Sequence, residues 1–466
     1  MNTKIRNIIL VVVLLEVILT VGIFGLPRAV RALPGAYYVR LQNNRLTAPV
    51  MALITTPLPQ ALPVAAASST TIDLAELPQI PGLQDTAVAA PTATPTLAPT
   101  VNNDTAVTTI SEPATTPEAT IAPTNTPTPT PQPTLSPPPA SAELANVPTV
   151  RQGFNNCGPA NLTIVLEYYG DATTQETAAA YLKPNREDRN VSPWQISDYV
   201  NEFTALRSTV HSGGNLEMIK QLIANGFPVV IEKGYEPNNA EGWYGHYLTV
   251  YGYDDEKGEI YTRDTNLGPF DGKPRIDDYE DFMYWWQQFN YTFYVVYLPT
   301  QEDLVMSIIP QVLQDKVTMW QYTADLARAE MRDNPDNVFG WFNLGVSLTY
   351  LGQETGDVTY YEEAAVNFDQ ARAIGLPPRT LYYEHRPLMA YYQLGRVDDV
   401  LELTDALLET VGGPWVEEIH WYRGHALAAQ GRLSAAREAY QAALTVNPNF
   451  YPAQTSLDWV NSLLGG

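Results

Sequence analysis

The stretch RQGFNNCGPANLTIVLEYYG, residues 151–170, decides how the middle of this chain folds. Its second half is apolar and predicts a helix from Gly158 to Tyr169, with Pro159 in the first turn, where proline is well tolerated. The helix follows directly on Cys157, which is the single cysteine among 466 residues. We therefore expect this cysteine at a helix N-terminus, where free N–H groups and the helix dipole favour the thiolate.

Strand-like runs follow this helix and indicate an α/β pattern that ends near residue 300. They are rich in β-branched and aromatic residues and are bounded by turn residues. An amphipathic helix is expected at 216–224, before the first of these runs. The run DDEKG, residues 254–258, predicts a hairpin turn between the second and third strands. The expected strands are 227–232, 247–253, 259–263 and 291–298.

Three residues of this region have the types and positions that nucleophilic catalysis requires. Cys157 is the candidate nucleophile, although a buried structural cysteine is the commoner role of a lone cysteine. His246 opens the second strand, and pairing around the hairpin turn places it opposite residue 265 or 266. Asp264 ends the partner strand at that level, within side-chain reach of the histidine. The pattern predicts a nucleophile, a base and an orienting carboxylate, with Gln152 as a candidate donor to the oxyanion.

The other patterns predict no further site. His211, in the run STVHSGG, is expected on the surface, and the acidic run 254–256 is expected as a solvated turn without calcium-loop spacing. A single cysteine excludes an intramolecular disulfide and a cysteine-rich zinc site. We expect neither a metal nor a cofactor. The formal net charge of −24 argues against binding to nucleic acid, which requires a basic surface.

The segment before the folded region predicts a membrane anchor on a stalk. After a short N-terminal segment, 1–7, the apolar run 8–26 is long enough to span a bilayer as a helix, and a cleaved signal peptide is the alternative. A juxtamembrane segment, 27–54, precedes a linker at 55–145 that is rich in Pro, Thr and Ala. Thirteen prolines between residues 91 and 139 prevent helix and sheet from propagating, so we expect disorder there.

The C-terminal region, 304–466, predicts an all-α domain built from repeats. Helices are expected to end at Gly352, Gly395 and Gly431, which recur after 43 and 36 residues. Small residues and aromatic residues alternate between paired helices with a spacing that resembles tetratricopeptide repeats. The residues that carry this resemblance are Trp341, Leu344, Gly345, Leu348, Ala364, Phe368 and Ala371 in one repeat, and Gly424, Leu427, Ala436, Tyr440, Ala443 and Pro448 in another.

Three segments resemble the peptidase C39-like branch of the papain-like cysteine proteases. They are QGFNNCGPANL at 152–162, GHYLTVYGYDD at 245–255 and YTRDTNLGP at 261–269, in the expected order and spacing. The resemblance covers about 150 residues and implies an α+β papain-like domain at 146–303. The sequence thus predicts a multidomain chain, with a transmembrane helix, a linker, a peptidase domain and helical repeats.

The resemblance also implies a role for each candidate residue. Cys157 becomes the nucleophile, His246 the base, Asp264 the orienter and Gln152 the oxyanion donor, although many papain-like enzymes place this glutamine slightly further from the cysteine. Family members that cut leader peptides after two glycines do so beside a transporter. This sequence contains no ATP-binding motif such as GxxxxGK[ST], which a transporter of this type would have. The double-glycine leader peptide is therefore not predicted as its substrate.

Three functions fit these observations. The first is a membrane-anchored extracytoplasmic cysteine peptidase that acts on a peptide or protein substrate, with repeats that bind this substrate or a partner protein. The second is a peptidase-like scaffold without activity, because repeat surfaces bind peptides without chemistry. The third is an acyl transferase or amidase that uses the same triad.

Overall fold

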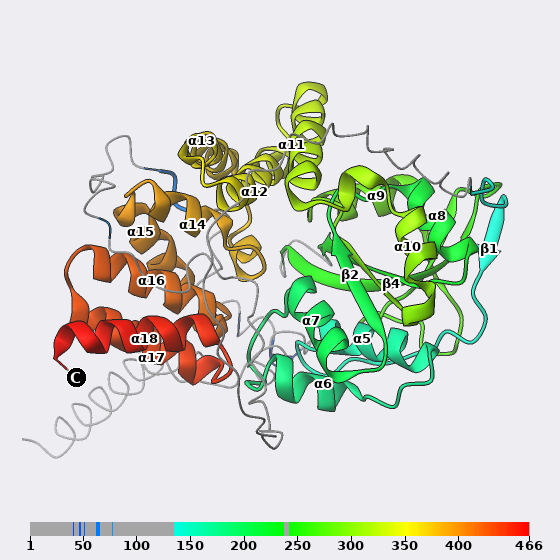
Figure 1. The fold of residues 1–466 in the computed structure, drawn as a ribbon, viewed down its shortest axis with the longest axis horizontal. Helices are drawn as coiled ribbons and strands as arrows, with labels where there is room; N and C mark the ends of the chain where they lie inside the picture. Colours follow the sequence, from blue (N-terminus) through cyan, green and yellow to red (C-terminus); the bar gives the residue numbers. More distant parts are fainter. Residues whose placement is uncertain are drawn as a thin grey trace, which may run out of the picture. The chain divides into compact units, whose positions relative to one another are not determined.

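The computed structural model describes residues 41, 46–47, 51, 62–65, 77, 135–236 and 242–465. The expected membrane span at 8–26 and most of the expected linker at 55–145 lie outside these residues. No helix among the residues described is both long enough and apolar enough to cross a membrane. The described chain contains an α+β region followed by a helical repeat region (Figure 1).

The α+β region is organised around an antiparallel sheet. Its strands are β1 (Ser141–Glu143), β2 (Arg207–His211), β3 (Val229–Tyr235), β4 (Tyr244–Asp254), β5 (Glu259–Arg263), β6 (Arg275–Asp278) and β7 (Phe293–Tyr297). In the described residues the order is β2-β7-β3-β4-β5-β6, with β1 added to the end of β4. The long strand β4 is central because it pairs with β1, β3 and β5.

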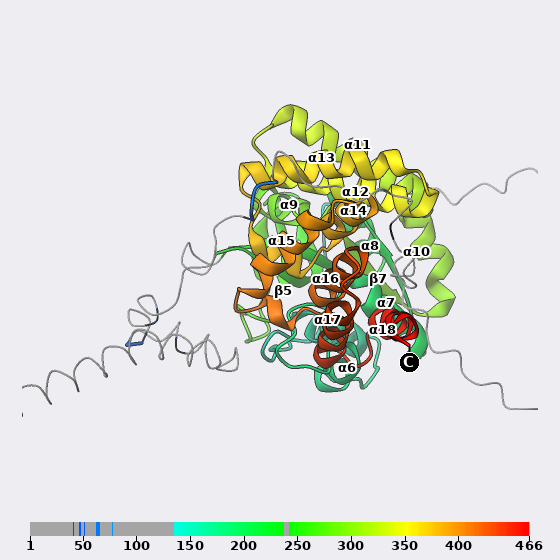
Figure 2. The same ribbon diagram turned by 90° about the vertical axis from the view of Figure 1, so that its left-hand side faces the viewer.

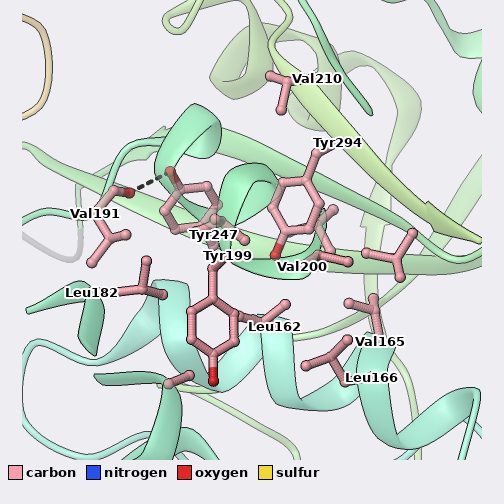
Figure 3. Packing of buried hydrophobic residues seen from close by; sticks show 14 of the residues in the cluster. Leu162, Val165, Leu166, Leu182, Val191, Tyr199, Val200, Val210, Tyr247 and Tyr294 are labelled. Carbon is pink, nitrogen blue, oxygen red and sulfur yellow. Dashed lines mark hydrogen bonds between the residues drawn. The ribbon is translucent and has the colours of Figure 1, made fainter. Parts of the chain in front are cut away.

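Helices of this region pack against the sheet. They are α5 (Cys157–Tyr168), α6 (Gln175–Leu182), α7 (Pro193–Phe203), α8 (Leu216–Ala224), α9 (Tyr279–Gln287) and α10 (Glu302–Ile308), with 3₁₀ turns at Pro299–Gln301 and Gln311–Leu313. Apolar residues of α5, α6 and α7 form one core with Val230, Tyr247 and Tyr294 of the sheet (Figure 3). The Tyr247 hydroxyl is buried in this core and donates a hydrogen bond to the carbonyl oxygen of Val191, at 2.8 Å.

Order begins earlier than the sequence predicted. The expected linker extended to residue 145, but β1 pairs with β4 in the register Ser141↔Asp254. The reason is local, because the last proline is Pro139 and the residues after it have backbone N–H groups that can pair. Near the start of the expected linker, Leu62 is buried and its N–H donates to the carbonyl oxygen of Leu376.

The repeat region consists of paired helices that follow one another in sequence (Figure 2). The helices are α11 (Lys316–Asp333), α12 (Val338–Thr355), α13 (Val358–Ile374), α14 (Arg386–Gln393), α15 (Val397–Leu408), α16 (Glu417–Ala429), α17 (Leu433–Val446) and α18 (Tyr451–Leu464), with 3₁₀ turns η5 (Pro378–Tyr382) and η6 (Gly413–Trp415). Gly345 of α12 lies against the Phe368 ring of α13, and Gly424 of α16 lies against the Tyr440 ring of α17. A side chain at either glycine would separate the pair.

Two details of the sequence interpretation are wrong. Gly352 does not end a helix, because α12 continues to Thr355 and ends at Gly356, which has φ of 73°. Gly352 instead gives space to the Tyr361 ring. His211 is not a surface residue, because it is 5% exposed and its Nδ1 lies 2.7 Å from the carbonyl oxygen of Leu313. That partner is 102 residues away in sequence, so the local pattern did not indicate it.

The repeat region packs directly against the sheet region. Asn343 of α12 donates from its side-chain amide to the carbonyl oxygen of Gln287, at 2.6 Å. The rings of Trp243 and Phe339 stack with centroids 5.6 Å apart. The Asn190 side chain donates to the carbonyl oxygen of Tyr383, at 3.3 Å. These contacts bring the turn between α13 and α14 to the strand that carries His246.

Candidate active site

Cys157 is the first residue of α5, as the sequence predicted to within one residue. The loop before it is shaped by two asparagines. Asn155 has φ of 53°, a left-handed conformation that asparagine tolerates better than most residues, and its carbonyl oxygen accepts from the Lys183 ammonium. Asn156 is the N-cap but makes no side-chain cap hydrogen bond, so the helix N-terminus faces the sulfur without a competing side-chain acceptor.

His246 and Asp264 meet as the hairpin argument predicted. Strands β4 and β5 pair with Thr249↔Arg263, and the partner strand ends there. The Nε2 atom of His246 lies 3.1 Å from Oδ1 of Asp264, and both residues are buried. This contact occupies one ring nitrogen, so Nδ1 is the nitrogen available to the sulfur of Cys157, with which the histidine also makes a hydrogen bond.

The Asp264 carboxylate is held in its charged form. Its Oδ1 accepts from the backbone N–H groups of Asn266 and Leu267, each at 2.8 Å, and its Oδ2 pairs with Arg275 at 3.0 Å. Burial alone would raise the pKa of this carboxyl. The charge and hydrogen bond of His246, the Leu267 N–H and Arg275 outweigh burial and hold the pKa well below its usual range.

Cys157 and His246 each shift the pKa of the other toward its charged form. Burial disfavours both charged forms, but the hydrogen bond and charge of His246, and then the Tyr247 N–H, lower the pKa of the Cys157 thiol. Burial would likewise lower the pKa of His246, but Asp264 first and Cys157 second raise it to about 9. Both shifts favour a thiolate beside an imidazolium.

Gln152 is held against Thr265, the residue that follows Asp264. Its backbone N–H donates to the carbonyl oxygen of Thr265, and its Oε1 accepts from the Thr265 hydroxyl, both at 2.8 Å. The oxygen end of the amide is therefore engaged, which leaves the nitrogen end as the donor. This orientation is the one that an oxyanion donor needs.

Two regions of the chain match family models. Residues 144–294 match the model of the Peptidase_C39 like family, and residues 417–450 match that of the tetratricopeptide repeat. Residues 144–294 are therefore similar to a C39-like peptidase domain and are called the C39-like domain below. A solved structure from Bacillus anthracis, described as a C39-like peptidase, matches 34% of this chain and 96% of its own at 18% identity, with a TM-score of 0.28. No curated protein matches the chain.

Sequence reasoning missed two supports of the C39-like domain. Arg275, on β6, neutralises Asp264 from a strand that the sequence did not predict. Asn161 is fully buried in α5, where its side-chain nitrogen donates to the carbonyl oxygen of Tyr247, at 3.0 Å, and its Oδ1 accepts from Thr249, at 2.7 Å. An asparagine four residues after the cysteine, in an otherwise apolar helix, was the available signal for this link between α5 and β4.

Proposed function

We propose that this chain hydrolyses peptide bonds by nucleophilic catalysis at Cys157. The observation that carries the proposal is the continuous contact from Cys157 through His246 to Asp264, with the histidine pKa raised to about 9. Cys157 then reacts as the thiolate, and His246 acts as the proton donor beside it. This is the combination that acyl transfer from an amide requires.

The reaction follows from these positions. The Cys157 sulfur attacks the peptide carbonyl carbon, and the carbonyl oxygen gains negative charge beside the Gln152 amide and the N-terminus of α5. His246 gives its proton to the leaving amine, so that the C–N bond breaks and an acyl thioester remains. Neutral His246 then takes a proton from water, which attacks the thioester and releases the acid and the thiol. Asp264 keeps the imidazole oriented throughout.

The proposal includes a place for the reaction. Residues 8–26 anchor the chain in a membrane, and the proline-rich segment holds the catalytic domain away from it on the extracytoplasmic side. Apolar length and proline content support this arrangement. Membrane fractionation of the full-length chain, followed by labelling with a reagent that does not cross membranes, tests it. Recovery in the soluble fraction would contradict the anchor.

The proposed chemistry can be tested on one atom, because the chain contains a single cysteine. The rate of alkylation of the full-length chain by iodoacetamide is measured against pH, with and without His246→Ala. We expect fast alkylation well below the pKa of about 8.5 of a free thiol, and a shift toward that value in the variant. An ordinary profile that His246→Ala leaves unchanged would contradict the pair. Peptide cleavage that persists in Cys157→Ala would contradict the nucleophile.

A further inference from the structure

A cavity of about 110 Å³ lies where the repeat region meets the C39-like domain. One water requires about 10–15 Å³ by the same measure, so the space is large enough for a side chain. The C39-like domain contributes residues of α7 and β3, and the repeat region contributes residues of α12, α14 and α16. Its polar lining includes Glu232, Tyr350, Glu384, His385, Arg386 and Glu418.

One lining residue of the cavity, Tyr383, contacts the strand that carries His246. Burial raises the pKa of the Tyr383 hydroxyl, and the charge of Cys157 raises it further, which places this lining residue within electrostatic range of the sulfur. The Tyr383 ring also packs against Gly245, where a Cβ atom would lie 2.9 Å from it. Since Gly245 precedes His246, one wall of the cavity contacts the strand that carries the base.

Carboxyl groups outnumber cations in this lining. Glu232, Glu384 and Glu418 are acidic, and among the described residues that line the cavity Arg386 is the single Lys or Arg. Arg386 already has partners, because it donates to the Tyr350 hydroxyl at 2.7 Å and lies over that ring. Burial first and the neighbouring Glu384 second raise the pKa of Glu232 well above its usual value, as expected for a carboxyl without a counter-charge.

Three buried polar atoms in the same lining have no hydrogen-bond partner among the described residues. They are Nε of Arg386, Nε2 of His385, which is 6% exposed, and the hydroxyl of Tyr422, which is 1% exposed. The nearest carboxylate to the histidine, Glu418, lies 3.8 Å away, beyond hydrogen-bond distance. Burial lowers the pKa of His385 to about 3, so the ring is neutral and adds no positive charge. Buried polar groups are normally paired, so these atoms point to a ligand. The histidine nitrogen and the tyrosine hydroxyl can accept hydrogen bonds from it, whereas the arginine nitrogen donates one.

We propose that this cavity binds the basic side chain, lysine or arginine, of the peptide that the C39-like domain cleaves. The proposal rests on the proposed peptidase function. A bound ammonium or guanidinium group supplies the charge that Glu232 and Glu418 lack and the donors that His385 and Tyr422 lack. The Tyr383 and Tyr422 rings add faces that attract a cation. The repeats thus supply part of the specificity of the active site.

The test measures binding without turnover, in the full-length Cys157→Ala chain. Two sets of short alanine peptides are compared by calorimetry, with a single lysine moved through the positions of one set and norleucine at the same positions of the other. We expect at least one lysine peptide to bind about tenfold or more tightly than its norleucine match, since a desolvated ion pair discriminates by at least this factor. No lysine preference at any position, including no binding of either set, would overturn the proposal.

Two variants assign the preference to the cavity. Glu232→Gln and Glu418→Gln keep the shape of the lining and remove the carboxyl group that loses its proton to pair with a bound cation, so each is expected to reduce the lysine preference severalfold. Glu438→Gln, at an exposed position of α17, is the matched control and is expected to leave the preference unchanged. Full preference in both cavity variants, with unchanged melting temperatures, would overturn the assignment. Selective lysine binding by a chain that never cleaves these peptides would instead count against the peptidase function.

Discussion

The buried charges around Asp264 and those around Glu418 are neutralised in different ways. Asp264 has a cation on each side, His246 and Arg275, and two backbone N–H donors. Glu418 faces other acids, because Asp188 and Glu384 raise its pKa after burial itself, and Arg386 lowers it only in part. We call the group around Asp264 the balanced cluster, which is charged at neutral pH. We call the group around Glu418 the unbalanced cluster, which retains a proton.

This difference separates a complete site from an incomplete one. A balanced cluster needs nothing more to keep its geometry, so it suits groups that must be oriented before the substrate arrives. An unbalanced cluster is costly to bury and gains stability from whatever supplies the missing charge. Under the proposed function, a preformed catalytic site is paired with a cavity whose electrostatics a ligand completes.

Removal of the central charge of the balanced cluster should have the largest effect. Asp264→Asn keeps an oxygen that accepts from the backbone N–H groups but loses the charge that stabilises the His246 imidazolium. We expect peptide turnover to fall about 10³–10⁴-fold and the alkylation profile of Cys157 to shift toward that of a free thiol. Asp277→Asn is the control, because Asp277 also pairs with Arg275 but the residues that raise the pKa of His246 do not include it. Equal losses in the two variants would contradict an orienting role.

The donor beside the balanced cluster should matter less. Gln152→Ala removes the amide nitrogen but leaves the thiolate–imidazolium pair untouched. We expect kcat to fall about 10²–10³-fold, with little change in KM and none in the alkylation profile. Thr265→Val, which removes only the hydroxyl that orients the amide, should cause a smaller loss. A changed alkylation profile in Gln152→Ala would show that the glutamine acts on the pair and not on the oxyanion.

The contact between His246 and Asp264, and the place of Cys157 at a helix N-terminus, could be predicted because these residues are joined by one hairpin or belong to one local pattern. Asp264 follows His246 by 18 residues, and a turn signal between them fixed which residues face each other. Cys157 was placed by the apolar helix that follows it. The contact of Arg275 with Asp264 could not be predicted from the sequence, because β6 is short and has no apolar alternation that predicts a strand.

The cavity could not be predicted for a different reason. Its acidic residues, Glu232, Glu384 and Glu418, lie on elements of two regions that are far apart in sequence. Each one alone is typical of a solvated surface, and their burial follows from how the repeats pack on the sheet. Periodicity gives the faces of a helix but not the element against which that face packs. His211 illustrates the same limit within the C39-like domain, because its partner Leu313 belongs to a segment 102 residues away.

The smallest expected effect concerns the unbalanced cluster. The contribution of Glu418 to the free energy of unfolding decreases as pH rises, whereas that of Asp264 decreases as pH falls. The pKa of Glu418 is raised to about 8 from a usual value of 4.5, so between these pH values the folded chain holds a proton that the unfolded chain releases. Its contribution to the free energy of unfolding is complete below pH 4.5 and is lost as pH rises through 8. The lowered pKa of Asp264 contributes stability that is lost only in acid.

Glu418→Gln should therefore flatten the decline in denaturant midpoint between pH 5 and pH 8, about the window set by these pKa values, whereas Glu438→Gln should leave it unchanged. An undiminished decline in Glu418→Gln would mean that Glu418 is charged in the folded chain, and the contrast between the two clusters would be lost.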